Sequence, residues 1–260
     1  MYASSPIMRI FVTLVFVFLL APLVVVVLVS FNPTAGFRIA TTEFSLRWYE
    51  KFLSLSAFRD SLFLVSLPIA LAASVCATAI GTLTAICLVR CRLIARNAME
   101  SFFMLPLLIP SILLGAALYL VAARIGVAGI WPLVLGHTLL GVPYVIRVVG
   151  AGLVAVDPRL EEAAISLGCN PVQAFRKVVL PILRSSIFSG AIFAFIVSFS
   201  DINLALFVAG PSSTTLPIHV FSQIFWEGDP TIAAASAVQI AIVGGLILVM
   251  QRLFNIRLSF

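Results

Sequence analysis

Charged residues are scarce in this sequence of 260 residues. Asp, Glu, Lys and Arg together make up 10% of the chain, whereas hydrophobic residues make up 62% and the mean hydropathy is +1.19. A water-soluble domain of this size does not need so apolar a composition to form its core. The balance therefore excludes an ordinary soluble protein and indicates that lipid surrounds much of the chain.

The sequence also lacks the motifs of common enzymes and metal sites. It contains no GxxxxGK[ST] phosphate-binding loop, no HExxH and no GxSxG. An intramembrane protease or acyltransferase would need paired catalytic groups, and only Asp201 and His137 lie at membrane depth. We therefore expect no catalytic residue, metal site or cofactor in this chain. Four cysteines lack metal-ligand spacing and a disulfide pattern, and we interpret them as unpaired apolar residues: Cys76, Cys87, Cys91 and Cys169.

Long apolar runs are what the sequence has instead. About 20 apolar residues in a helix cross the hydrocarbon core, and in lipid only helices and closed barrels satisfy every backbone hydrogen bond. No alternating pattern indicates a barrel. We predict an all-α, polytopic protein with six transmembrane helices, forming one membrane domain over 1–260. The predicted spans are Ile7–Val29, Phe58–Val89, Glu100–Ala123, Gly129–Leu153, Leu183–Val208 and Ile232–Leu253.

The basic residues predict how these spans are oriented. With a cytoplasmic N-terminus, the inner segments hold eleven of the 16 Lys and Arg residues: Arg9, Arg90, Arg92, Arg96, Arg147, Arg159, Arg176, Lys177, Arg184, Arg252 and Arg257. The outer segments hold the other five: Arg38, Arg47, Lys51, Arg59 and Arg124. Because inner segments are usually the more basic, we expect both termini in the cytoplasm. The first run could instead be a signal peptide, but it is too long, contains Pro22 and has no cleavage site.

Two outer connections contain residues that favour folded pieces. Residues 32–57 include an aromatic-rich amphipathic stretch, for which a short helix in the headgroup region and an ordinary surface connection both remain open. Residues 209–231 include Trp226 and three prolines, which favour a re-entrant or interfacial piece. Glu227 and Asp229 in this connection could meet a substrate-delivering protein or simply be solvated.

The connection between the fourth and fifth predicted spans, residues 157–181, is longer than a turn requires. Asp157 before Pro158 and Asn170 before Pro171 are typical helix starts, and Gly168 separates them, so we predict two short helices. Each helix has an apolar face: Leu160, Ala164 and Leu167 in the first, and Val172, Phe175 and Val179 in the second. Such a face outside the membrane must pack against the spans or a cytoplasmic partner.

Residues in this connection resemble a known motif. Glu162, Ala163 and Ala164, then Gly168, then Phe175, Val178, Leu180 and Pro181 resemble the EAA loop of ABC importer permeases. The segments LPLLIPSILLG, GHTLLGVPYVIR, SFSDINLALFVAGP and TLPIHVF resemble the second permease subunit of spermidine/putrescine-type transporters. The sequence departs from the motif at Cys169, where alanine is usual, and at Ser185, where many members have proline.

The resemblance implies a type I ABC importer permease fold whose coupling helices transmit closure of an ATPase to the spans. It also implies that the membrane is a bacterial inner membrane. The implied ATPase-coupling residues are Glu161, Glu162, Ala163, Ala164, Gly168 and Phe175. The implied partners are a second permease subunit, two ATP-binding subunits that hold ATP and Mg²⁺, and an extracytoplasmic solute-binding protein. A polyamine is the expected cargo, with opine-like compounds, ferric iron, phosphonates and oxyanions as alternatives. A stand-alone channel or secondary transporter would have no use for a docking loop.

Polar residues near the spans are candidates for a substrate path: Asp201, Asn203, Ser200 and Tyr144. A carboxylate within a span costs about 2.5–3.5 kcal/mol, so it should face protein or water and could attract a cation. Asp201 could instead pair with Arg124 or Arg147 or cap a broken helix end, and Tyr144 could fill a helix interface. His137 has no second ligand at metal spacing, so we expect it to be packed and hydrogen-bonded. Pro106 and Pro110 predict kinks in the third span.

Overall fold

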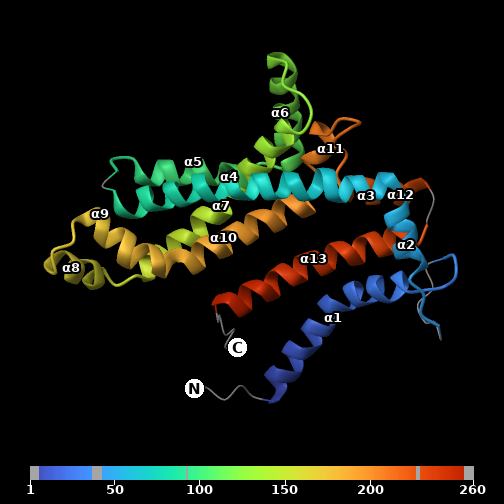
Figure 1. The fold of residues 1–260 in the computed structure, drawn as a ribbon, viewed down its shortest axis with the longest axis horizontal. Helices are drawn as coiled ribbons and strands as arrows, with labels where there is room; N and C mark the ends of the chain where they lie inside the picture. Colours follow the sequence, from blue (N-terminus) through green and yellow to red (C-terminus); the bar gives the residue numbers. More distant parts are fainter. Residues whose placement is uncertain (1–5, 37–42, 92, 227–228, 255–260) are drawn as a thin grey trace. The chain divides into compact units, whose positions relative to one another are not determined.

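The chain is built from helices. The computed structural model describes residues 6–36, 43–91, 93–226 and 229–254, and within them it contains no strand (Figure 1). Five stretches are long and apolar enough to cross a membrane, and a sixth is counted when a bent helix pair is taken as one span. The stretches are α1 (Pro6–Ser30), α3–η1–α4 (Ser56–Arg90), α5 (Arg96–Leu108) with α6 (Ser111–Ile125), α7 (Trp131–Ala155), α9–η2–α10 (Pro171–Ser200) and α13 (Thr231–Phe254). The predicted all-α polytopic class is confirmed.

The chain packs as two compact units, Met1–Asp60 with His219–Gly245 and Ser61–Ile218 with Leu246–Phe260. Its shorter helices are α2 (Arg47–Ser54), α3 (Ser56–Asp60), α8 (Pro158–Ser166), α9 (Pro171–Ala174), α11 (Ala205–Val208) and α12 (Leu216–Trp226). The single membrane domain over residues 1–260 stays a prediction.

The first unit confirms a short helix in the first outer connection. One face of α2 buries Trp48 and Phe52, and the indole of Trp48 donates a hydrogen bond to the carbonyl of Asn32 (2.6 Å). Lys51 of α2 forms an ion pair with Asp229, whose other oxygen accepts the backbone N–H and the hydroxyl of Thr231 (2.9 and 2.8 Å). Burial raises the pKa of Asp229, but these hydrogen bonds outweigh burial and leave that pKa below its ordinary value. Asp229 is therefore a structural link and a helix cap, whereas Glu227 lies outside the described residues.

The second unit is organised around three helices, α4 (Leu67–Arg90), α7 and α10 (Leu180–Ser200), which pack on one another (Figure 1). Small residues let these backbones approach closely, as is common between membrane helices. A Cβ on Gly81 of α4 would lie 2.6 Å from the Cβ of Val145 in α7, and one on Gly190 of α10 would lie 3.3 Å from the Cα of the same valine. The hydroxyl of Ser74 also donates to the carbonyl of Ala191 (2.7 Å). Val145 is thus the point at which all three helices meet.

The third predicted span is broken rather than continuous. The axes of α5 and α6 differ by 98°, and Ile109 between them is extended, with a ψ of 128°. The residue before a proline avoids the α-helical region, so Pro110 sets the break. Pro106 lies inside α5 without ending it. Of the two predicted kinks, only the one at Pro110 interrupts the helix.

The fifth predicted span, Leu183–Val208, is wrong at both ends. A single helical stretch runs from Pro171 to Ser200, so the second short helix of the 157–181 connection continues into the span. A π-helical turn, η2 (Phe175–Val179), stands directly before Leu180 and Pro181. Because proline lacks an N–H and clashes with the carbonyl four residues earlier, the wider turn lets the helix continue. The same arrangement recurs where η1 (Ser61–Ser66) precedes Leu67 and Pro68.

The close approach at Val145 generates a stability prediction. Gly81→Ala should lower the free energy of unfolding by about 1–3 kcal/mol, because its new methyl group overpacks the helix contact. Gly244→Ala is the matched control, since a Cβ there meets no heavy atom within 4 Å, and it should be neutral or stabilising by about 0.5–1 kcal/mol. Denaturant unfolding of the two variants in detergent measures both values. Equal changes in the two variants would contradict the packing argument.

Candidate functional site

Asp201 lies where α10 ends, not inside a span. Its backbone is extended (ψ 132°), and its Oδ2 accepts the backbone N–H groups of Leu204 and Ala205 at 3.0 and 3.1 Å. The carboxylate therefore caps α11, as one of the sequence-based alternatives proposed. No ion pair within 4 Å joins it to Arg124 or Arg147, both of which are described residues. Capping leaves Asp201 available to a cavity, because only one carboxylate oxygen accepts these two bonds.

A cavity of about 380 Å³ opens beside this break. Asp201 and Tyr144 line it together with the bend between α5 and α6, and its full lining is Pro106, Leu107, Leu108, Ile109, Pro110, Ser111, Leu140, Tyr144, Val197 and Asp201. Ser200 and Asn203 are exposed and are not among the lining residues. Of the four predicted path residues, the structure thus brings two together at one cavity.

His137 stands behind Asp201 in the protein interior. Its side chain is 1% exposed, and its Nδ1 shares a 2.7 Å hydrogen bond with the hydroxyl of Ser198. Its Nε2 lies 3.7 Å from Oδ2 of Asp201 and has no hydrogen-bond partner. That distance is too long for a hydrogen bond. The prediction of a packed, hydrogen-bonded histidine is confirmed.

The two helix breaks are packed against each other. A Cβ on Gly115 of α6 would lie 2.7 Å from the carbonyl oxygen of Leu204, in the turn that Asp201 caps. Leu204 is fully buried and belongs to an apolar cluster with Leu133 and Leu140 of α7. The position of Asp201 at the cavity is therefore set by close packing as well as by hydrogen bonds.

A second cavity, of about 490 Å³, was missed by sequence reasoning. It is lined by α4, α5 and α7, with Ala85, Leu88, Val89, Arg96, Glu100, Ile146, Arg147, Gly150, Ala151 and Val154. Five residues of α7 that line one cavity or the other follow helical spacing on one face: Leu140, Tyr144, Arg147, Ala151 and Val154. One face of α7 therefore borders both cavities, and the signal for it was the spacing of Tyr144 and Arg147.

The 157–181 connection contains the two predicted helix starts. Asp157 accepts the N–H of Arg159 (3.0 Å), and Asn170 forms a capping box with Gln173 (2.8 and 3.1 Å). Between them Gly168 has a φ of +95°, a conformation that favours glycine. The predicted glycine break between two helices is confirmed.

The two helices differ in what their apolar faces contact. In the second, Ala174 and Val179 are buried and Phe175 packs on the core of α4, α7 and α10. In the first, α8, no residue is buried, and Leu167 is 87% exposed. Other exposed apolar side chains of this surface are Leu160, Ile165 and Val172. We call Leu160, Ile165, Leu167 and Val172 the docking surface.

The predicted coupling residues divide in the same way. Glu162 and Ala163 are exposed on α8, Ala164 is half-buried, and Gly168 is exposed at the break. Glu161 instead forms an ion pair with Arg90 at the end of α4, and Phe175 is half-buried beneath the guanidinium of the same arginine. The sequence indicated Arg90 only as one of the basic residues of the inner segments and did not predict these contacts.

Comparisons with known proteins identify the family of this chain. Residues 77–259 match the family described as binding-protein-dependent transport system inner membrane component. The chain is 34% identical to the putrescine transport system permease protein PotI of Escherichia coli K12 over 250 residues, which cover 92% of this chain and 88% of that protein. It is 29% identical to the spermidine/putrescine transport system permease protein PotC of Haemophilus influenzae, covering 93% of each.

Solved structures show the same fold at low sequence identity. A bacterial ABC transporter for import of the acidic polysaccharide alginate matches 97% of this chain and 95% of its own, with a TM-score of 0.70 and 13% identity. The methionine ABC transporter MetNI matches 73% of this chain and 91% of its own, with a TM-score of 0.62 and 18% identity. The predicted type I importer fold is confirmed. The chain therefore belongs to the family of binding-protein-dependent transport system inner membrane components, and it is a multi-pass ABC importer permease subunit rather than an enzyme.

Proposed function

We propose that this permease imports a polyamine, and that the Asp201 cavity is a binding site for this cationic cargo. The observation that carries the proposal is the Asp201 carboxylate at the cavity wall. Among the residues that the structure describes, no basic side chain forms an ion pair with it apart from the nearby His137. A phosphonate or an oxyanion would be repelled there, whereas an ammonium group would be attracted. Relatives named as putrescine and spermidine/putrescine permeases support the same cargo class.

The path is proposed to follow one face of α7. Tyr144 and Asp201 belong to the first cavity, and Arg147, Arg96 and Glu100 to the second. Broken helices that line a cavity are common where transporters bind their substrates. We place Ser200 and Asn203 near the path entrance, since they are exposed and flank Asp201 in sequence without lining its cavity.

The docking surface on the 157–181 connection is proposed to receive an ATP-binding subunit, which holds ATP and Mg²⁺. Unpaired apolar side chains on a short cytoplasmic helix support this role, with Glu162, Ala163, Ala164 and Gly168 beside them. Because the helix that starts at Pro171 runs unbroken to Ser200, movement of the connection reaches Asp201 directly. The full importer would contain a second permease subunit, two ATP-binding subunits and an extracytoplasmic binding protein, with both termini of this chain in the cytoplasm.

The cargo class is tested by reconstituting the chain with its neighbouring permease, ATPase and binding-protein products in liposomes. Stimulation of ATP hydrolysis by a binding protein loaded with putrescine or spermidine is the expected result. Stimulation only by a binding protein loaded with a phosphonate, an oxyanion or ferric iron would refute the polyamine assignment and leave the permease assignment intact.

Asp201→Asn separates the charge of this residue from its capping role. The amide oxygen of Asn still accepts the N–H groups of Leu204 and Ala205, so the turn should persist. Uptake of labelled putrescine should fall about 10- to 100-fold, since a hydrogen bond to a charged group contributes about 1.5–3 kcal/mol. Assembly and basal ATP hydrolysis should be unchanged. Glu50→Gln, which removes a carboxylate charge at an exposed position of α2, is the control, and normal uptake by Asp201→Asn would exclude Asp201 from the path.

Leu167→Ser tests the docking surface. Removing this exposed apolar side chain should weaken binding of the ATP-binding subunit about 10- to 100-fold, because burying a leucine contributes about 1.5–3 kcal/mol. Leu46→Ser is the matched control, since Leu46 is 60% exposed and lies outside the connection. Affinity measured in detergent by fluorescence titration gives the comparison. Equal affinities for the two variants would show that the ATPase docks elsewhere.

A further inference from the structure

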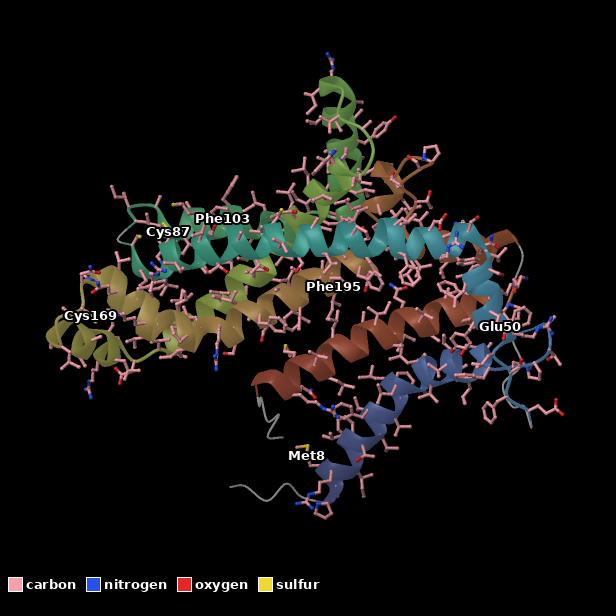
Figure 2. All side chains as sticks on the ribbon, viewed as in Figure 1. Met8, Glu50, Cys87, Phe103, Cys169 and Phe195 are labelled. Carbon is pink, nitrogen blue, oxygen red and sulfur yellow. The ribbon has the colours of Figure 1, made fainter. Side chains whose placement is uncertain are left out.

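Arg90, the last residue of α4, contacts both helices of the 157–181 connection. Its guanidinium forms an ion pair with the carboxylate of Glu161 in α8 and lies 5.7 Å from the centre of the Phe175 ring in η2. Figure 2 shows this end of the unit, where Cys87 in α4 and Cys169 between α8 and α9 are labelled. One side chain of α4 thus contacts both α8 and η2, at residues that lie more than 70 positions further along the chain.

The ion pair is partly shielded from water. The exposed fraction is 30% for the Arg90 side chain and 18% for the Glu161 side chain. Arg90 is in the last turn of α4 and Glu161 is in the first turn of α8, so each charge stands at the helix end whose dipole stabilises it. Glu162, the next residue, is exposed. Of these two consecutive carboxylates, Glu161 is therefore paired within this protein and Glu162 is left exposed.

This pair attaches α8 to α4. No side chain of α8 is buried, and the helix packs on α9 and η2. The second helix has a different anchor, because it continues into α10 and buries Ala174 and Val179. Without the ion pair, α8 would move against its neighbours α9 and η2 while α4 stayed in place.

We propose that Arg90 is a positioning residue of the coupling machinery, which transmits movement of α8 to α4 through Glu161 and Phe175. The proposal rests on the proposed docking of an ATP-binding subunit on α8. α4 borders the second cavity with Ala85, Leu88 and Val89, the last of them adjacent to Arg90. Movement of the connection therefore affects both cavities. The α10 helix acts at the Asp201 cavity, and Arg90 with α4 acts at the second cavity.

The test is a charge exchange in the complete reconstituted importer. Arg90→Glu and Glu161→Arg each place like charges side by side, and the double variant restores an opposite pair with its partners exchanged. We measure the number of putrescine molecules imported per ATP hydrolysed. Each single variant should lower this ratio about 5-fold or more, the lower range of coupling between sites, and the double variant should recover most of it. Affinity for the ATP-binding subunit should stay normal in all three.

Two control variants separate pairing from general effects of charge and fold. Arg184→Glu makes the same change of charge at an exposed position of α10 and should leave the ratio unchanged. Arg90→Lys keeps the charge but lacks the planar group that stacks on Phe175, so it should lose less of the ratio than Arg90→Glu. If a reversed variant does not assemble, Arg90→Gln gives the same comparison in an intact complex.

The outcomes distinguish this proposal from the docking proposal. A normal import ratio in Arg90→Glu or Arg90→Gln overturns the role of Arg90, as does a double variant no better than the single ones. If Leu167→Ser binds the ATPase normally, docking on α8 is wrong. The exchange experiment then reports only an internal ion pair, whose loss would leave the import ratio unchanged.

Discussion

A backbone N–H group that has no acceptor within a helix needs another acceptor when its surroundings are apolar. The rest of the second unit depends on this constraint. Where α10 ends, the carboxylate of Asp201 accepts two such groups. Where α12 begins, the hydroxyl of Ser66 accepts the N–H of Leu216 at 2.7 Å. A break in a membrane helix therefore brings a polar side chain with it, and at Asp201 that side chain also lines a cavity.

The second unit has a closely packed three-helix core, and its cavities and docking surface lie outside that core. Gly81 and Gly190 let α4 and α10 close on Val145 of α7, which leaves little freedom inside the three-helix core. The cavities lie on another face of α7, and the docking surface lies on a connection outside the core. Movement of the connection would therefore reach the cavities through helices that are closely packed on one another.

Sequence reasoning predicted the helices and the coupling connection well, because their signals are local. Apolar length predicted the spans, and Asp157, Gly168 and Asn170 predicted the helix starts and the break. It placed Asp201 inside a span because an apolar run continues through Ala205–Val208. The chain turns there because Asp201 caps the turn and Leu204 packs against α6 and α7. The pairing of Arg90 with Glu161 joins distant segments, which no local pattern records. The role of each residue in transport stays a prediction.

The unbroken helix from Pro171 to Ser200 has a mechanical consequence, because its tight contact with Val145 falls at Gly190 rather than at its middle. At about 1.5 Å per residue, the arm toward the 157–181 connection is about 29 Å long and the arm toward Asp201 about 15 Å. If the helix tilts about this fulcrum, it is a reducing lever. A wide swing at the 157–181 connection would become a displacement about half as large, delivered with about twice the force, at the Asp201 carboxylate.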